Sequence, residues 1–189
     1  TMAEKQATDM RESLSIAKQS VDLAREEFIS THRPRLIVRR VSIEIAKGKG
    51  VPDLLGVQFI VANIGDTRGT IVKMSLNIWF PDSSQNLPAI PPYGESIFPA
   101  TVLESGESAP ITHVHSAADM LIRFQRLEQS VGFASVDGGN NTAPAFLFIG
   151  FITYEDKLKR KLRTAFCRSY NFSTKRFDPI PHPDYEYRD

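Results

Sequence analysis

The sequence predicts a mainly β fold, an antiparallel β-sandwich with a long N-terminal helix and one inserted helix. Residues 3–31 contain no Gly or Pro and are rich in good helix formers. After Pro34, runs of β-branched and aromatic residues are separated by turn-rich segments, as is typical of strands. A second helical segment interrupts these runs at residues 116–129. Strands and helices do not alternate along the chain, which favours antiparallel sheets.

A heptad stripe runs along the N-terminal helix, which we assign to residues 1–32 as a stalk. Its members recur at steps of three and four residues and are the candidate partner-binding face: Met10, Leu14, Ala17, Val21, Ala24 and Phe28. The stripe fits either a coiled-coil seam, with itself or with another protein, or a face that packs on the β domain. It spans under three heptads, so both alternatives stay open.

Proline residues mark the borders of the remaining segments. Arg33-Pro34 ends the helix, because Pro lacks a backbone N–H and clashes with the preceding turn. The sandwich domain is predicted over residues 33–173. Residues 174–189, with Pro179, Pro181 and Pro183, are predicted to form an extended and loosely attached tail.

The first three strands are predicted from their apolar patterns. Residues 36–45 change apolar parity near Arg39-Arg40, which indicates a bulge or burial on both faces. Residues 56–63 form the second strand. Residues 70–80 alternate regularly. The apolar face predicted for this third strand comprises Val72, Met74, Leu76, Ile78 and Phe80.

The later strands complete the prediction. Residues 101–103 form a short strand. Residues 146–154 are apolar on both faces, so this strand is predicted to be central or to have its second face covered, for example by a helix. A charged hairpin loop at 155–160 leads to a partner strand at 162–170. Six or seven strands with this spacing predict an immunoglobulin-like sandwich, with a barrel as the alternative.

Three segments together resemble a large group of mostly uncharacterised bacterial proteins. They are Arg33-Pro34-Arg35-Leu36 after the helix, Asn63-Ile64-Gly65-Asp66-Thr67 after a strand, and the hairpin from Gly150 to Tyr170. In that group a membrane helix precedes a short coiled coil and a small β domain. The chain departs from the group at Lys157-Leu158-Lys159-Arg160, where a Gly is common, and residues 116–144 look like an addition. The resemblance implies membrane anchoring, at the bacterial inner membrane, and supplies no catalytic residues.

Bulk composition narrows the classes of partner. The chain has 189 residues with 23 basic and 22 acidic side chains, a net charge of +1. Such a balance gives no overall attraction to nucleic acid, so no nucleic-acid partner is expected. No window of about 18 apolar residues could span a membrane. Since the sequence starts at Thr1 with the helical pattern soon running, we expect a piece of a longer protein, with its membrane segment outside this chain.

No residue pattern predicts catalysis or a cofactor. His113-x-His115 with Cys167 lacks further zinc ligands, and Cys167 is predicted to be a packed strand thiol. Asp137-Gly138-Gly139-Asn140-Asn141 lacks the spacing of a calcium loop. Two basic groups are predicted to be solvated and balanced by acids: Arg33, Arg35, Arg39 and Arg40, and Lys157, Lys159, Arg160, Lys161 and Arg163. We therefore expect a noncatalytic binding or scaffolding domain at a membrane, or else a soluble module that associates through its helix.

Overall fold

The computed structural model describes residues 2–47, 53–81, 87–94, 98–114, 119–134 and 145–188. The chain divides into two compact units, residues 1–33 and 34–189, which are described separately. The predictions made for residues 48–52, 82–86, 95–97, 115–118 and 135–144 concern residues outside the described ranges.

The first unit is a single helix, α1 (Met2–Thr31), as predicted. Its last turn is closed by the His32 backbone N–H, which donates to the Phe28 carbonyl at 2.9 Å. The Thr31 hydroxyl donates to the Glu27 carbonyl at 2.8 Å, which satisfies another terminal carbonyl group. Pro34 follows and cannot continue this pattern.

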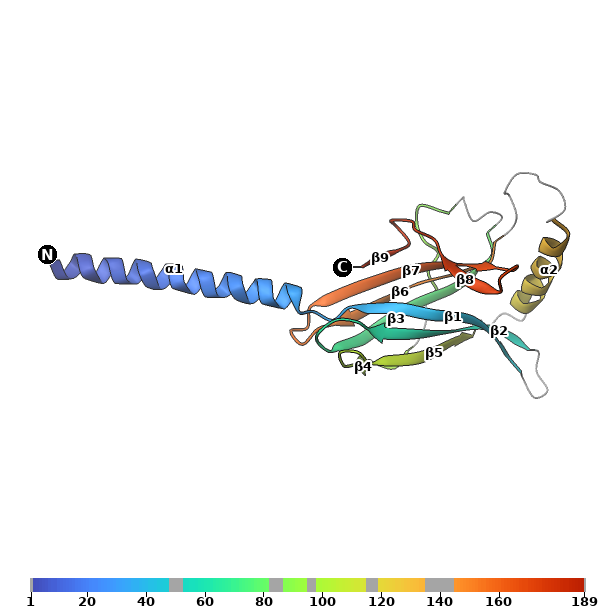
Figure 1. Ribbon diagram of the computed structural model, residues 1–189, viewed down its shortest axis with the longest axis horizontal. Coiled ribbons are helices and arrows are strands. Elements are labelled where there is room, and N and C mark those ends of the chain that lie inside the picture. The colour runs from blue at the N-terminus through green and yellow to red at the C-terminus, as the bar shows by residue number, and fades with distance from the viewer. Residues whose placement is uncertain are drawn as a thin grey trace. The chain divides into compact units, whose positions relative to one another are not determined.

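The second unit contains two antiparallel sheets and one inserted helix, consistent with a β-sandwich (Figure 1). The three-stranded sheet has the order β1 (Leu36–Ala46), β2 (Leu54–Asn63) and β5 (Ser108–Val114). The six-stranded sheet has the order β4 (Thr101–Leu103), β3 (Gly69–Trp79), β6 (Leu147–Glu155), β7 (Lys161–Asn171) and β8 (Arg176–Pro179), and β9 (Tyr187–Arg188) also pairs with β7. The helix α2 (Asp119–Ala134) lies at one end of the sheets.

The main core lies between the two sheets and is built from aromatic rings of both. Phe59 on β2 contacts Phe148 on β6, with ring centroids 5.3 Å apart. Phe148 in turn lies 5.2 Å from Phe166 on β7. All three side chains are essentially inaccessible to solvent, so each contributes a large buried apolar area. Phe124 of α2 closes this core at one end by packing on Phe146, with ring centroids 5.2 Å apart.

Two bulges adjust which residues face the core. The pairing of β1 with β2 shifts register between Arg39 and Ser42, and Arg40 has a φ of 49°, so the predicted bulge is confirmed. A second shift, between Ile71 and Lys73, was not predicted. It leaves Val72 as the extra residue. Val72 is therefore exposed, and Ile71 takes the core position that the alternation had given to Val72.

The elements around α2 differ from their prediction. Residues 108–114 form β5, a strand that the sequence did not predict. The helix extends to Ala134, five residues beyond the predicted end at 129, while its predicted cap lies outside the described residues.

The C-terminal tail is firmly attached, so the prediction of a loose tail is wrong. β8 and β9 both pair with β7. Between them, Tyr185 is fully buried, and its hydroxyl donates to the Pro88 carbonyl at 2.7 Å. Tyr185 covers the second apolar face of the six-stranded sheet, which is formed by Leu147, Ile149 and Cys167. Tail and loop residues, rather than a helix, therefore cover this face.

The Asn63 side chain joins three segments at one end of the sandwich. Its Oδ1 accepts from the backbone N–H groups of Arg35 at 3.2 Å and Gly65 at 3.0 Å. Its Nδ2 donates to the carbonyls of Thr67 at 2.8 Å and Leu103 at 3.0 Å. The side chain is buried and fully hydrogen-bonded, so the Asn63–Thr67 motif has a structural role.

Replacing Asn63 by Ala is expected to lower the free energy of unfolding by about 3 kcal/mol, because four backbone groups lose a partner, two of them in buried hydrogen bonds. Urea unfolding followed by Trp79 fluorescence measures this loss. Asn77→Ala is the matched control: it removes a single amide bond, to the Pro92 carbonyl, and is expected to cost about 1 kcal/mol. Equal losses in the two variants would contradict the proposed joining role of Asn63.

Candidate functional site

The predicted partner-binding residues lie on an exposed face of α1. Met10, Leu14, Val21 and Phe28 are each more than 60% exposed, and Ala17 and Ala24 are exposed too. Large exposed apolar side chains at this regular spacing are typical of a surface that binds another protein. The structure thus brings the six predicted residues together on one face, and no described contact occupies their side chains except the stacking of Phe28 on His32.

Besides Met2 at its start, α1 exposes two apolar residues that the sequence analysis missed. Ile16 and Leu23 are 58% and 66% exposed and are seven residues apart, so they share a position of the same heptad pattern. They lie beside the stripe, beyond the row of Ser13 and Ser20. Their seven-residue spacing was the signal that could have revealed them.

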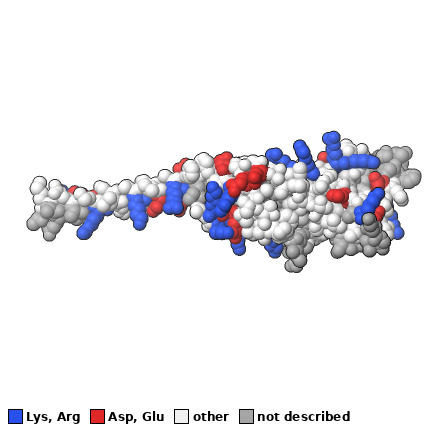
Figure 2. Space-filling model, turned by 90° about the horizontal axis from the view of Figure 1, so that it is seen from below, with Lys and Arg blue, Asp and Glu red and all other residues white. Residues whose placement is uncertain are grey.

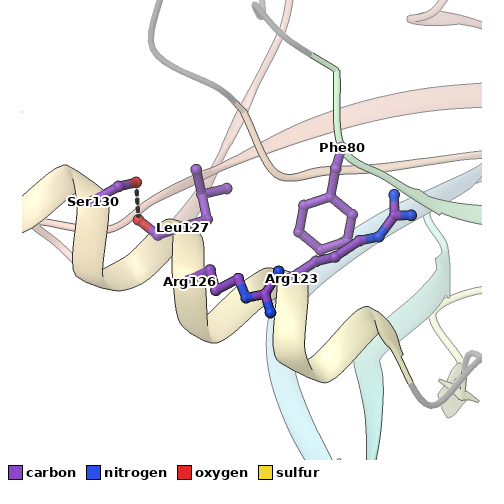
Figure 3. Close-up of a pocket in the computed structure, with 5 residues that line it drawn as sticks. All are labelled: Phe80, Arg123, Arg126, Leu127 and Ser130. Atoms are coloured by element: carbon purple, nitrogen blue, oxygen red, sulfur yellow. Dashed lines mark hydrogen bonds between the residues drawn. The ribbon is translucent and has the colours of Figure 1, made fainter.

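A shallow hollow of about 540 Å³ lies between α2 and the residue that follows β3 (Figure 3). Phe80 and the buried Leu127 form its apolar wall, and Arg123, Arg126 and Ser130 of α2 complete its lining. The sequence did not predict it, because its lining joins Phe80 to α2, and β4 and β5 lie between them in the chain.

The side chains of this hollow are suited to binding rather than to proton transfer. Arg123 pairs with Asp119, with Nε and Oδ2 3.0 Å apart, and both side chains are more than half exposed. The Ser130 hydroxyl donates to the Leu127 carbonyl at 2.8 Å, as Figure 3 shows. A guanidinium group stays protonated at neutral pH and cannot act as a base. The hollow could therefore hold a carboxylate or phosphate group against an apolar wall.

Charged side chains of both signs are interspersed on the face shown in Figure 2. In the hairpin after β6, Lys159 pairs with Glu155 at 3.2 Å and Arg160 pairs with Asp156 at 2.7 Å. The prediction that acids balance this second basic group is confirmed for these two residues.

Asp156 fixes the hairpin between β6 and β7. Its Oδ1 accepts from the backbone N–H groups of Leu158 at 2.8 Å and Arg160 at 2.9 Å. Its Oδ2 accepts from the Arg160 guanidinium. Burial alone would raise the pKa of the carboxyl group, but these donors outweigh burial and lower the pKa below its usual value of 3.8. Lys159 adopts the left-handed conformation at this turn, with a φ of 62°, a region of backbone space that favours Gly.

Gly150 of the same motif also has a structural role. A Cβ atom at this position would lie 2.7 Å from the Ser75 carbonyl oxygen and 2.9 Å from the Phe166 ring. Glycine is therefore needed for the close approach of β3 and β6 in front of that ring.

Arg163 stacks within a group of aromatic rings on the outer face of the six-stranded sheet. Its guanidinium carbon lies 3.5 Å from the Phe151 ring centroid and 5.8 Å from those of Tyr93 and Tyr187. Burial raises the pKa of Tyr93 to about 12, with a further increase from Tyr187 and a decrease from Arg163. The cation bound by this aromatic cluster is thus the Arg163 side chain of the same protein. The cluster attaches β9 to the sheet.

Cys167 is buried in β7, as predicted. Burial raises the pKa of its thiol to about 12, while Arg168 acts to lower it and Glu186 to raise it. A thiol is nucleophilic only as the thiolate, so Cys167 is inert at neutral pH. Its backbone N–H donates to Glu186 Oε2, and Glu186 also pairs with Arg168, which ties the tail to β7.

Of the other candidate ligands, the structure describes only His113 and Cys167. His113 lies on β5 with its ring 6.2 Å from the Phe148 ring, whereas His115 and residues 137–141 lie outside the described residues. Within the described ranges, no three His, Cys, Asp or Glu side chains gather as a metal ion would require.

Asp156→Asn is expected to lower the free energy of unfolding by about 1–2 kcal/mol at pH 7, because the charge-assisted bond to Arg160 is weakened. The folded-state pKa of Asp156 is depressed, so its stabilisation is present above the unfolded pKa and is lost as the pH falls through the folded value. Urea unfolding of both proteins between pH 7 and pH 2.5 should show the difference shrinking below pH 4. Glu155→Gln, which breaks a more exposed pair, is the control, and a pH-independent difference for Asp156→Asn would refute this role.

Cys167 is expected to react with a thiol reagent at least about 100-fold more slowly than an exposed cysteine at pH 8, because it is buried and protonated. Absorbance of the released chromophore measures the rate. The variant Ser15→Cys on α1 supplies the exposed reference thiol, and denaturant should make both thiols react at once. Comparable rates in the folded protein would show that Cys167 is accessible.

The functional argument for this chain rests on the contacts described above. No family model, curated protein or solved structure matches this chain. The resemblance of its motifs to the membrane-anchored bacterial group therefore stays a prediction. In the part of the chain that the structure describes, no helix is both long and apolar enough to cross a membrane.

Proposed function

We propose that the protein is a noncatalytic binding or scaffolding domain displayed at a bacterial membrane, the inner membrane, by a segment outside this chain. The membrane part of the proposal rests on the resemblance of the motifs around Pro34, Asn63 and Gly150. The binding part rests on the exposed face of α1.

The observation that carries the proposal is a difference between the two units in how their apolar residues are covered. The helical unit exposes six apolar residues in a heptad pattern, while the β unit is held together by its own core. The residues of the motifs support this reading, because Asn63, Gly150 and Asp156 are each committed to structural contacts. A helix with an unpartnered apolar face gains stability when a partner covers it.

A second candidate function is favoured by the same face of α1. In this alternative the protein is a soluble module that associates through α1 with itself or with a partner protein, without a membrane segment. Only the localisation distinguishes the two proposals, since both assign binding to the helix.

We also propose that the β unit has the immunoglobulin-like topology. If β1 to β7 are lettered A, B, C, C′, E, F and G, one sheet has the order A-B-E and the other has the order C′-C-F-G, followed by β8. Immunoglobulin constant domains place A, B, E and D in one sheet and C, F and G in the other. The present order supports a variant in which the fourth strand, β4, pairs with β3 rather than with β5.

Fractionation of cells that express the full-length protein at its natural level tests the membrane proposal. We expect the protein to remain in the membrane fraction after a carbonate wash and to be released by detergent, because a spanning segment is held by the hydrocarbon core. The 189-residue chain expressed alone is the control, and the wash should remove it from membranes. Full-length protein that leaves the membrane in the same wash would favour the soluble alternative.

A further inference from the structure

We infer that residues 180–188, which follow β8, form a latch that opens as a unit while the rest of the β unit stays folded. In the structure this latch is closed over Cys167, the single cysteine of the chain. Opening exposes the Cys167 thiol and the apolar face formed by Leu147 and Ile149. The latch is independent of the binding proposed for α1, because it lies wholly in the β unit.

The latch packs on a small buried cluster that is separate from the main core. Tyr185 is the one side chain of residues 180–188 that is fully buried, and it lies in the cluster of Leu147, Ile149 and Cys167. The main core between the two sheets contains no residue of the latch. Segments that bury few apolar side chains open locally at a lower free energy than the whole domain unfolds. The main core therefore keeps its own contacts when the latch opens.

The latch is joined to the six-stranded sheet at a few separate points. Its prolines, Pro181 and Pro183, lack a backbone N–H, and the pairing of β8 with β7 does not continue into β9. β9 itself contains two residues. Between β8 and β9, Glu186 pairs with Arg168 and accepts from the backbone N–H of Cys167 at 3.1 Å. These contacts can break without disturbing the pairing of β3, β6 and β7.

Contacts within the latch hold it in a compact turn. The backbone N–H groups of Tyr185 and Glu186 donate to the His182 carbonyl at 3.0 Å and 2.8 Å. The rings of His182 and Tyr185 meet edge to face, with centroids 5.3 Å apart. These contacts do not involve β7, so they persist when the latch leaves the sheet. The latch therefore moves as one piece rather than residue by residue.

The aromatic cluster around Arg163 stabilises the closed latch less than its ring contacts alone would. The Tyr93 hydroxyl and the Arg163 Nε are buried there with no hydrogen-bond partner within the described ranges. A buried polar atom without a partner costs free energy, which offsets part of the favourable contact between Arg163 and the rings. Because Tyr187 of β9 belongs to this cluster, opening of the latch lets water reach its polar atoms.

Modification of Cys167 by dithiodipyridine, an uncharged disulfide reagent, tests the latch in the full chain. The thiol loses its proton to solvent, the thiolate attacks the reagent to form a mixed disulfide, and the absorbance of the released thiopyridone gives the rate. Since the thiol is buried in the closed state, this rate follows the fraction of open molecules. We expect the rate to be nearly independent of urea below the unfolding transition, because opening of the latch exposes little surface.

Two variants distinguish the latch from other routes to the thiol. Asn63→Ala removes hydrogen bonds that do not involve the latch. Its expected loss of stability would raise the rate about 100-fold if Cys167 reacted only through global unfolding, whereas reaction through the latch leaves the rate within about twofold. Glu186→Gln weakens the pair with Arg168 and should raise the rate roughly tenfold. Glu128→Gln, at an exposed position of α2, is the matched control and should leave the rate unchanged.

Two results would overturn the inference. A rate that rises about 100-fold in Asn63→Ala, or that climbs with urea as steeply as global unfolding does, would show that only unfolding exposes Cys167. An unchanged rate in Glu186→Gln would show that the reagent reaches the thiol without breaking the contacts of the latch. If Asn63→Ala does not fold, the urea dependence measured on the unmodified chain decides between the latch and global unfolding.

Discussion

The side-chain amide of Asn63 is the constraint that fixes one end of the β unit. Its two donors and two acceptor contacts are all used, and they join the segment entering β1, the turn after β2 and the end of β4. β4 belongs to one sheet and β2 to the other, so a single buried side chain sets how the sheets meet at this end. An amide suits this position because it donates and accepts at once without the desolvation cost of a charge.

The opposite face of the six-stranded sheet depends on a different kind of contact. Leu147, Ile149 and Cys167 would be exposed there without the tail, and Tyr185 covers them as a buried ring whose hydroxyl still finds a carbonyl partner. The pairing of Arg168 with Glu186 holds the tail at the neighbouring position of β7. Together with the strand pairing of β8 and β9, this ring and this charge-assisted pair attach the tail and complete a second buried cluster.

Patterns of neighbouring residues predicted the elements that such patterns determine. They failed where contacts between residues far apart in the chain determine the structure. The parity change at Arg39-Arg40 predicted the bulge in β1, since burial itself produces the pattern. β5 escaped prediction because only Ile111 is buried in an edge strand that also contains Pro110. The prolines of the tail indicated loose attachment, whereas Tyr185 overrides them through tertiary contact. On α1 the spacing of the apolar residues predicted the stripe. The hollow at Arg123 and Phe80 forms where two separate segments meet, and residue spacing does not reveal such a contact.

The two units differ in where their stability comes from, and this difference bears on function. The β unit buries an aromatic core between its own sheets, so its stability comes from packing within the unit. The helix of α1 has 30 residues and exposes its apolar face, so its stability depends largely on intrinsic propensity until that face is covered. Association and helix stability are therefore coupled in α1, because anything that binds the folded helix also stabilises it. Covering the apolar face of α1 would thus stabilise the helix, whereas the stability of the β unit comes from its own core.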